Sequence, residues 1–467
     1  MKRILPWLLL ILMVMPVWAQ TEVPPEPPVV EQAAPSPETA PKEAPLQLDL
    51  QEALERALAN SPTLEEYRSR VRQAKYKVEE AYTPAYPTAD FSATYSHVEP
   101  PVSLPGGVVI SPTDNYQFNL TLKQAIFTFG RLHWTTLTNE LSELSARENY
   151  RNEIDKLIQD VAVRYIQAEL AADQVAITED TLASQEANLK QSELLFEQGV
   201  AARFDVLRNR SAVSQARQAV LQARNDAKLA KARLLSALGL SLDQEVVLAP
   251  SVASEPPPFS LEQSRARALE ERPELAALDW AIQAAEAQVQ ATWAQNNPRL
   301  DIQNSTVNRN VTGFSPGTQN TTSLVLSIPL FDGGLTRTRA RQAEEAVTQL
   351  RQNFEQTQRV VLLDVEDSYR SVQTAYEAIK VSEQQVEESE EALRVAQLRY
   401  KNGVSTNVEL LDAQAALSQA RFAMAQARAN YQVARWRWWK ATSGEYPVDV
   451  PLTPEYRVPD PSSAAKE

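Results

Sequence analysis

The sequence predicts a mainly helical chain that also carries four membrane-type β-strands and consists of two tandem repeats. The first observation is the scarcity of glycine: 467 residues contain 11 glycines, whereas an average chain has about 7%. The chain is therefore expected to contain few turns and long helices. The second observation is that residues 131–198 and 335–402 contain neither glycine nor proline. The third is that the segments before these stretches alternate apolar and polar residues with a period of two.

The N-terminal segment, residues 1–19, has the features of a secretory signal peptide. Two basic residues precede an apolar run, and Val17-Trp18-Ala19 supplies small residues at −3 and −1 of the expected cleavage site. Residues 20–46 form a proline-rich linker, and residues 445–467 a proline-rich tail; such composition cannot bury a core. No later apolar run approaches the roughly 18 residues of a membrane-spanning helix.

Composition argues against several classes of function. The 46 basic and 60 acidic residues give a net charge of −14, so we expect no nucleic-acid partner. The basic, tryptophan-rich run at 435–440 is expected to pack at the end of a helix. The chain has no Cys and two His, which argues against thiolate metal sites, thiol nucleophiles and multi-histidine sites. We therefore predict no cofactor, no metal site and no enzymatic activity.

Residues 47–240 and 259–444 are two copies of one repeat, joined by a linker over 241–258. The segment Phe196-Glu197-Gln198-Gly199-Val200 of the first copy corresponds to Tyr400-Lys401-Asn402-Gly403-Val404 of the second, at an offset of 204. Nearer the start of each copy the offset is 211, so the first copy has seven extra residues before its long helix.

Each copy is expected to contain a helix, a β-hairpin and a long helical hairpin, in that order. The glycine-free stretches are rich in Ala, Gln, Glu, Leu and Arg, which are good helix formers. At 1.5 Å per residue, each predicts a helix of about 100 Å. A return helix is expected after the glycine that follows each stretch, over roughly 204–238 and 406–442. The predicted helical hairpins therefore span 131–239 and 335–443.

The β-hairpins are expected over 88–123 and 299–328. In the first, Phe91, Ala93 and Tyr95 alternate with polar residues, and the second repeats this pattern more loosely. Strands of about 9–11 residues with one apolar face are typical of transmembrane β-barrels. Two β-hairpins packed on a soluble helical domain would alternate in the same way.

The export signal and the aromatic residues favour the membrane alternative. The aromatic residues lie just beyond the ends of the predicted strands and resemble an interfacial girdle in contact with outer-membrane lipid. They are Tyr82, Phe127, Phe129, Trp134, Trp293 and Phe331. Four strands cannot close a barrel, and an open sheet edge is excluded in lipid, so several chains must share one barrel. Two chains would supply about 8 strands and three about 12.

Several motifs match a known family. They are the tandem repeat, Ser61-Pro62 with Arg272-Pro273, Ile126-Phe127-Thr128-Phe129-Gly130, Ile328-Pro329-Leu330-Phe331-Asp332-Gly333-Gly334, and Tyr400-Lys401-Asn402-Gly403-Val404 followed by Val408-Glu409-Leu410-Leu411-Asp412-Ala413-Gln414. With these motifs the chain resembles the TolC family of outer-membrane efflux and secretion channels over nearly all of residues 47–444.

The resemblance implies a homotrimer. Its 12-stranded outer-membrane β-barrel would continue into a helical barrel in the periplasm. A periplasmic adaptor protein would dock at the tip of the helical barrel, around Gly199, Val200, Gly403 and Val404. An inner-membrane transporter would supply the energy, and the channel itself would be a passive conduit.

The resemblance also implies that Glu409 and Asp412 constrict the pore. Their i,i+3 spacing puts both carboxylates on one helix face, one turn past the glycine turn. Threefold symmetry would then bring six acids into one ring, which attracts cations. Two solvated acids on the surface of a hairpin are the alternative that the residues alone would favour.

One position departs from the family pattern. Family members lock the closed tip with an arginine paired to an aspartate of the other hairpin. Asp205 matches that aspartate, but Ser405 stands at the arginine position. Arg203 is close in sequence, although it lies on the same hairpin as Asp205. We therefore expect a looser tip lock, or one held by other hydrogen bonds.

The sequence thus predicts a channel in the outer membrane of a Gram-negative-type bacterium, extending into the periplasm. No cluster of Met, His or Cys favours metal export, so we expect the efflux of small amphiphilic molecules. Type I protein secretion is an alternative within the same class. A soluble periplasmic coiled-coil scaffold or adaptor is the alternative from another class.

Overall fold

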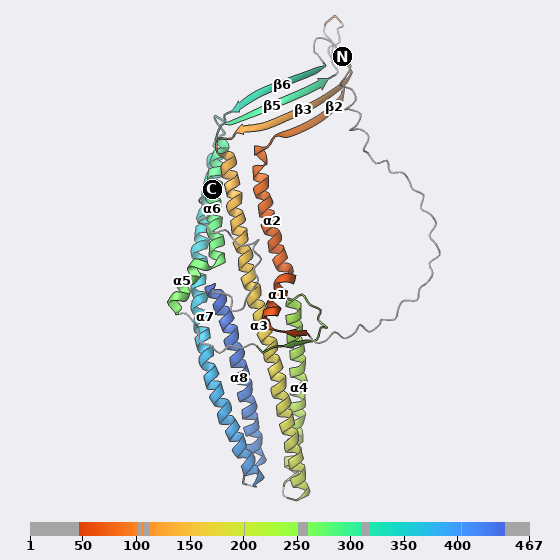
Figure 1. The fold of residues 1–467 in the computed structure, drawn as a ribbon, viewed down its shortest axis with the longest axis vertical. Helices are drawn as coiled ribbons and strands as arrows, with labels where there is room; N and C mark the ends of the chain where they lie inside the picture. The colour runs from red at the N-terminus through yellow and green to blue at the C-terminus, as the bar shows by residue number, and fades with distance from the viewer. Residues whose placement is uncertain are drawn as a thin grey trace, which may run out of the picture. The chain divides into compact units, whose positions relative to one another are not determined.

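The computed structural model describes residues 46–100, 105–106, 113–199, 201–250, 260–309, 317–402 and 404–443. These residues belong to one compact unit, Pro45–Glu467. Long helices run side by side, and a β-sheet lies beyond one of their ends (Figure 1). The predicted signal peptide (1–19), the predicted linker up to residue 45, residue 444 and the predicted tail (445–467) lie outside the described residues.

The described residues of the first half form four α-helices and four strands. In order they are β1 (Leu46–Leu48), α1 (Leu50–Asn60), α2 (Pro62–Tyr82), β2 (Thr88–His97), β3 (Asp114–Phe127), α3 (Arg131–Glu197), α4 (Arg203–Ala237) and β4 (Val246–Leu248). The second half contains α5 (Leu261–Glu271), α6 (Pro273–Trp293), β5 (Arg299–Arg309), β6 (Thr318–Ser327), α7 (Leu335–Lys401) and α8 (Asn407–Thr442). A short 3₁₀ turn precedes β2 and another precedes β5.

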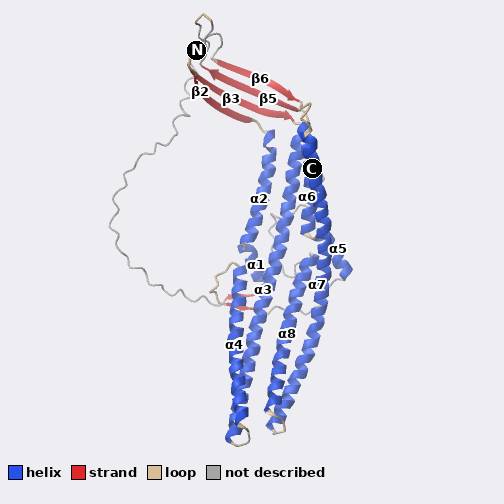
Figure 2. Ribbon diagram, turned by 180° about the vertical axis from the view of Figure 1, so that it is seen from behind, coloured by secondary structure: helices blue, strands red, loops and turns tan. Residues whose placement is uncertain are grey.

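The two long helices, α3 and α7, have the same length of 67 residues. Each begins directly after a glycine in the left-handed conformation, Gly130 (φ 89°) or Gly334 (φ 84°). A side chain at this φ would strain the backbone, so glycine fixes where each helix begins. Each long helix then packs against a return helix to form a helical hairpin (Figure 2).

Two helices, rather than the single helix expected from the sequence, precede each β-hairpin. Pro62 and Pro273 cause the break, because the residue before a proline is disfavoured in helical conformation. Ser61 and Arg272 accordingly have extended ψ values of 117° and 122°. The Ser61 hydroxyl caps α2 by accepting from the Leu64 amide.

Arg272 occupies in the second repeat the position that Ser61, a small capping residue, occupies in the first, and it is a buried cation. Its guanidinium donates to the Ala441 carbonyl at 2.9 Å and to Glu274 at 2.7 Å, and it also pairs with Asp364. The arginine therefore ties the junction between α5 and α6 to α7 and α8. The buried positive charge is tolerated because two carboxylates compensate it.

A two-stranded parallel sheet lies in the core beside α1, α3 and α4. β1 pairs with β4, with Leu46 opposite Val246. Tyr165 of α3 is fully buried, and its hydroxyl oxygen lies 2.9 Å from the Leu48 carbonyl and 2.7 Å from that of Ala249. Its single proton can be donated to one of these carbonyls at a time. The phenol thus binds α3 to both short strands.

The tryptophans near the end of α8 pack inward, as the sequence predicted. Trp436, Trp438 and Trp439 are each 6–7% exposed. Two of them, Trp436 and Trp439, join the core that surrounds Tyr165. Packing in the core accounts for these apolar residues beside the cations of the run.

The larger sheet has four antiparallel strands in the order β2-β3-β5-β6. β3 and β5 pair across the two repeats, with one register shift between Ala125 and Phe127. β2 and β6 are edge strands, so the described strands of one chain form an open sheet and no closed barrel (Figure 2). β3 continues to Phe127, four residues beyond the predicted end of the first β-hairpin.

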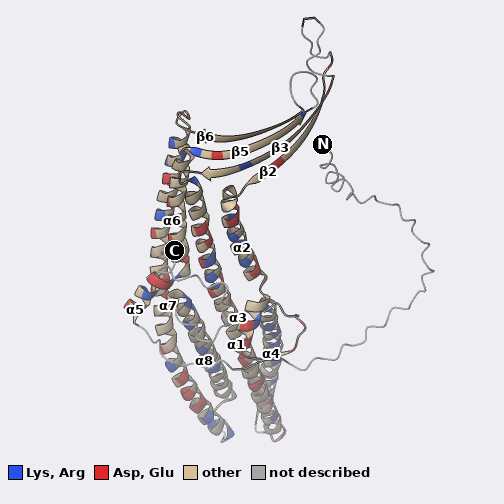
Figure 3. Cartoon of the chain, turned by 45° about the horizontal axis from the view of Figure 1, so that its top comes forward, with Lys and Arg blue, Asp and Glu red and all other residues tan. Residues whose placement is uncertain are grey.

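Large apolar side chains of this sheet are exposed. They include Phe91 (68%), Leu324 (64%), Leu326 (57%) and Phe118 (44%). Lys, Arg, Asp and Glu concentrate on the helices (Figure 3), and β6 contains none of them. A sheet with exposed apolar residues and two open edges is incomplete as a single chain in water.

Among the described residues, no helix combines the length and the apolar character needed to cross a membrane.

We predict that Tyr165→Phe lowers the free energy of unfolding by about 1–3 kcal/mol, because buried carbonyls lose their donor. The measurement is the unfolding midpoint by circular dichroism in detergent. Tyr76→Phe is the matched control, since Tyr76 is 61% exposed. Equal midpoints for the two variants would contradict the structural role of the Tyr165 hydroxyl.

Candidate functional site: the hairpin ends and the strand–helix junction

The turns of the two helical hairpins lie at the end of the helices away from the four-stranded sheet (Figure 1). Gly199 has a φ of 74°, and a Cβ added there would meet no atom within 4 Å. Backbone conformation, and not space, therefore requires glycine at this turn. Val404 follows the second turn and is 69% exposed. Val200 and Gly403, the other two predicted docking residues, lie outside the described residues.

The predicted pore acids lie at the start of α8. Thr406 caps this helix, since its hydroxyl accepts from the Glu409 amide at 3.3 Å. Glu409 and Asp412 are both exposed in the single chain. The Glu409 carboxylate, in the first turn, also interacts favourably with the positive end of the helix dipole.

Ser405 has a contact that the sequence did not reveal. Its hydroxyl donates to Glu409 Oε2 at 2.6 Å, and the guanidinium of Arg399 lies 4.0 Å from the same oxygen. The residue at the position of the family's arginine therefore holds one of the predicted pore acids. The spacing of four residues across a helix start is the signal that indicates such a bond.

Asp205 and Arg203 both lie in the first turn of α4. They form no ion pair with each other in the part of the chain that the structure describes. Burial raises the pKa of Tyr400, and the negative charge of Asp205 raises it further.

A polar seam joins the two hairpins near their turns, and sequence reasoning missed it. Asn407 donates to Asn209 at 3.0 Å, and both side chains are buried. Further along, the amide of Gln414 contacts Ser184 and Asn188. The signal in the sequence is that Asn407 and Gln414 differ from the residues at the same positions of the first repeat.

The six predicted girdle residues lie where strands and helices meet. Tyr82 ends α2 and donates to Glu140 at 2.7 Å, and Trp293 ends α6. Phe127 and Phe129 form an edge-to-face pair with centroids 4.5 Å apart. Phe127 lies inside β3 and not beyond it.

The remaining two girdle residues flank the long helices. Trp134 lies in the first turn of α3 against Gly130, and Phe331 is 89% exposed just before α7. The neighbouring Asp332 accepts from the amides of Gly334 and Thr336. Hydrogen bonds from the Thr336 hydroxyl and then from the amides of Thr336 and Gly334 lower the pKa of Asp332 to about 2.

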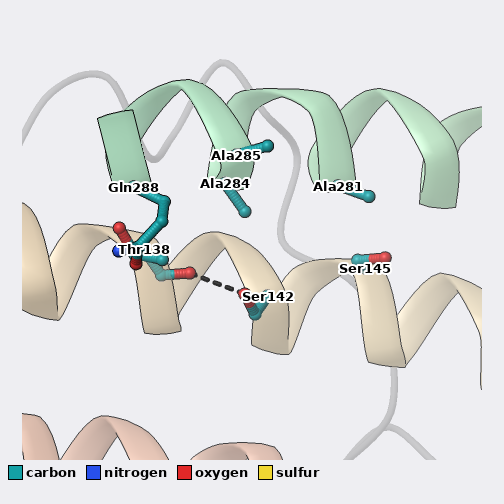
Figure 4. A pocket seen from close by; sticks show the side chains of 7 residues that line it. All are labelled: Thr138, Ser142, Ser145, Ala281, Ala284, Ala285 and Gln288. Carbon is teal, nitrogen blue, oxygen red and sulfur yellow. Dashed lines mark hydrogen bonds between the residues drawn. The ribbon is translucent and has the colours of Figure 1, made fainter. Parts of the chain in front are cut away.

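A shallow pocket between α3 and α6 does not offer a ligand site (Figure 4). It is lined by small or neutral side chains: Thr138, Ser142, Ser145, Ala281, Ala284, Ala285 and Gln288. Ser142 donates to the Thr138 carbonyl and Ser145 to that of Ala277. The hydroxyls are thus engaged by helix backbones, and the small residues let α3 and α6 approach closely. The described residues also contain no cluster of metal-ligating side chains.

Comparison with known proteins decides the class. A model of the family described as "Outer membrane efflux protein" matches residues 53–240 and 265–441. The chain belongs to the outer membrane efflux protein family. It is therefore a TolC-like outer-membrane channel protein and not an enzyme. This assignment sets aside the soluble periplasmic scaffold that the sequence alone left open.

Individual relatives support the same family. The alkaline protease secretion protein AprF of Pseudomonas aeruginosa is 27% identical over 337 residues, covering 69% of this chain and 68% of AprF. The outer membrane protein TolC of Escherichia coli is 24% identical over 393 residues, covering 80% of this chain and 78% of TolC. A crystal structure of a membrane protein from Pseudomonas aeruginosa has the same fold, with a TM-score of 0.74 and 22% identity, covering 84% of this chain and 93% of that one.

Ser405→Arg is expected to strengthen closure of the tip, because a guanidinium there would pair with Asp205 of the other hairpin. An exposed pair contributes up to about 1 kcal/mol, so the ratio of closed to open channels should rise up to about fivefold. Single-channel recording in planar bilayers measures this ratio.

Two matched variants control for the lost bond between Ser405 and Glu409. Ser405→Ala removes that bond without adding charge, and Ser405→Arg with Asp205→Asn removes the new partner. Unchanged gating in Ser405→Arg would show that position 405 does not control closure.

Proposed function

We propose that the protein is the outer-membrane channel of a tripartite export system and works as a homotrimer. The observation that supports this most directly is the open four-stranded sheet with its exposed apolar residues. In a bilayer, unpaired edge amides and carbonyls cost several kcal/mol each. Edge-to-edge pairing of three copies would satisfy them in a barrel of about 12 strands.

In the proposed orientation, outer-membrane lipid surrounds the sheet and the helices extend into the periplasm. The girdle aromatics would lie at the level of the lipid headgroups, where rings with one polar edge are favoured. Tyr82, with its hydroxyl on Glu140, has this amphipathic character. The helical hairpins of three chains would then form the wall of a periplasmic conduit.

The hairpin ends would be the gated part of this conduit. Glu409 and Asp412 would form an acidic ring, and Ser405 would orient Glu409 through the bond described above. The docking surface proposed for a periplasmic adaptor comprises both glycine turns, including Gly199 and Val404. An inner-membrane transporter would supply the energy, since the channel family itself is not enzymatic.

Small-molecule efflux is the proposed transport function, in keeping with the family's description as efflux proteins. Protein secretion is the second candidate, because AprF, a relative at 27% identity, is named for alkaline protease secretion. A deletion strain separates the two. Sensitivity to amphiphilic toxins would support efflux, whereas the intracellular retention of one exported protein without such sensitivity would support secretion.

We predict that Glu409→Gln combined with Asp412→Asn lowers the cation-over-anion permeability ratio of the reconstituted channel severalfold, because the pore loses a ring of negative charge. Reversal potentials in a salt gradient measure this ratio. Glu197→Gln is the matched control, since Glu197 is an exposed acid at the other hairpin turn. A permeability ratio equal to that of the unmodified channel would rule out the proposed constriction.

A further inference from the structure

An exposed basic patch lies at the start of α7, where the chain leaves the four-stranded sheet. It consists of Arg337, Arg339 and Arg341, all in the first two turns of the helix. In the part of the chain that the structure describes, none of the three forms an ion pair or a side-chain hydrogen bond. Further along the same helix, by contrast, Arg351 pairs with Glu286 of α6. The basic patch is therefore uncompensated positive charge in a chain whose net charge is −14.

The dipole of α7 makes this placement unfavourable without a partner, because the start of a helix favours carboxylates and disfavours cations. The first turn of α7 contains no acid. Asp332, just before the helix, is engaged by the amides of Gly334 and Thr336, which donate to it at 2.9 and 2.8 Å. Among the described residues, Glu344 and Glu345 form no ion pair with the basic patch either. An anion from outside the chain would supply the missing compensation.

The internal repeat gives the level of the basic patch along the molecule. A shift of 204 residues maps Arg337 onto His133 and Thr338 onto Trp134. Trp134 belongs to the girdle, which the proposed orientation puts at the level of the lipid headgroups. Since α3 and α7 begin at equivalent glycines next to the same sheet, the basic patch lies at that level too.

Exposed apolar residues lie next to the basic patch in sequence. Ile328, Leu330 and Phe331, between β6 and α7, are each more than half exposed. Apolar side chains followed within a few residues by arginines suit the boundary between acyl chains and phosphates. An arginine there can lay its aliphatic stem on apolar surface while its guanidinium reaches the polar layer. A soluble anion would use the cations but leave the apolar side chains uncovered.

Arg337 and Arg341 share one face of α7, and Arg339 lies on the opposite face. At 3.6 residues per turn, the first two project within about 40° of each other, and Arg339 projects about 160° from both. Glu366, further along, lies on the same face as Arg337 and pairs with Arg265 of α5. α5 lies at the edge of the group of long helices (Figure 1). In the proposed channel this is the outer side, because three copies of α5 on the inner side would obstruct the conduit.

We infer that Arg337 and Arg341 bind the phosphate of an anionic glycerophospholipid in the periplasmic leaflet of the outer membrane. This inference rests on the proposed membrane orientation and names the lipid class that the channel recognises there. The two guanidiniums are one helical turn apart, and each can donate two parallel hydrogen bonds to phosphate oxygens. The acyl chains of the same lipid would cover Leu330 and Phe331. A headgroup with a net negative charge is preferred, because it compensates both cations.

Lipid titration of the mature protein in detergent tests the site, with native mass spectrometry as the measurement of the dissociation constant. Short-chain phosphatidylglycerol should bind severalfold more tightly than short-chain phosphatidylcholine, which has the same tails and no net charge. Arg337→Gln combined with Arg341→Gln should raise the dissociation constant of phosphatidylglycerol about tenfold or more, since each basic residue contributes about fivefold near an anionic lipid. The dissociation constant of phosphatidylcholine should stay the same.

Arg339→Gln is the matched control, because it removes the same charge from the opposite face of the same turn. It should leave the dissociation constant of phosphatidylglycerol unchanged. Arg337→Lys combined with Arg341→Lys keeps both charges and should retain most of the affinity, which separates the loss of charge from a loss of folding. Inorganic phosphate at the lipid's concentration should not displace the lipid, since it has no acyl chains to contact Leu330 and Phe331.

Equal weakening by Arg339→Gln would show that net charge, and not the outer face of α7, determines the affinity, and would overturn the site. Equal affinities of the unmodified protein for the two lipids would overturn it as well, as would displacement of the lipid by inorganic phosphate. The particle mass in the same spectra tests the proposed assembly separately. A trimer without lipid preference would contradict this inference alone, whereas a monomer would contradict the proposed channel.

Discussion

Backbone hydrogen bonding at the edges of the four-stranded sheet is the constraint on which the rest of the molecule depends. β2 and β6 end the sheet on either side, with no further strand among the described residues to pair with them. Lipid offers no substitute for the missing partners, so a chain of this kind can function in a bilayer only by pairing with others. Because four strands cannot close a barrel, the proposed channel must be an assembly of several chains. The helices then have the same symmetry as that assembly.

Internal duplication reduces the number of different contacts that such an assembly needs. α3 and α7 have equal lengths, and a shift of 204 residues maps the ion pair Arg217–Glu186 of the first hairpin onto Arg421–Glu390 of the second. Two departures from this near-symmetry lie near the hairpin ends. There Gln414 replaces the repeat of Arg210, and Asn407 replaces that of Arg203. The proposed gate lies in the same region, so we expect opening to rearrange contacts that differ between the repeats.

Much of the fold could be predicted because its signals are local. The absence of glycine and proline over 131–198 and 335–402 predicts the long helices, and two-residue periodicity predicts the strands. Pro62 also indicates the division into α1 and α2, although one helix was expected there. In contrast, β1 and β4 have three residues each, too few for any periodic pattern, and depend on the long-range contact with Tyr165.

The candidate site was less predictable because most of its contacts join residues that are far apart in the sequence. Resemblance supplied Glu409, Asp412 and the glycine turns, whereas the bond from Ser405 to Glu409 depends on how the chain enters α8. The contacts of Gln414 join residues more than 220 positions apart, and composition carries no trace of them. Burial of Arg272 likewise depends on Asp364 and Ala441 arriving from distant helices.

Single-particle imaging of the mature protein purified in detergent tests the central claim most directly. The proposed channel predicts a hollow particle with threefold symmetry, with a detergent belt around the sheet at one end and the hairpin turns at the other. A solid rod or a compact monomer without a detergent belt would contradict it, because the open sheet would then lack both the lipid and the neighbouring chains that it requires.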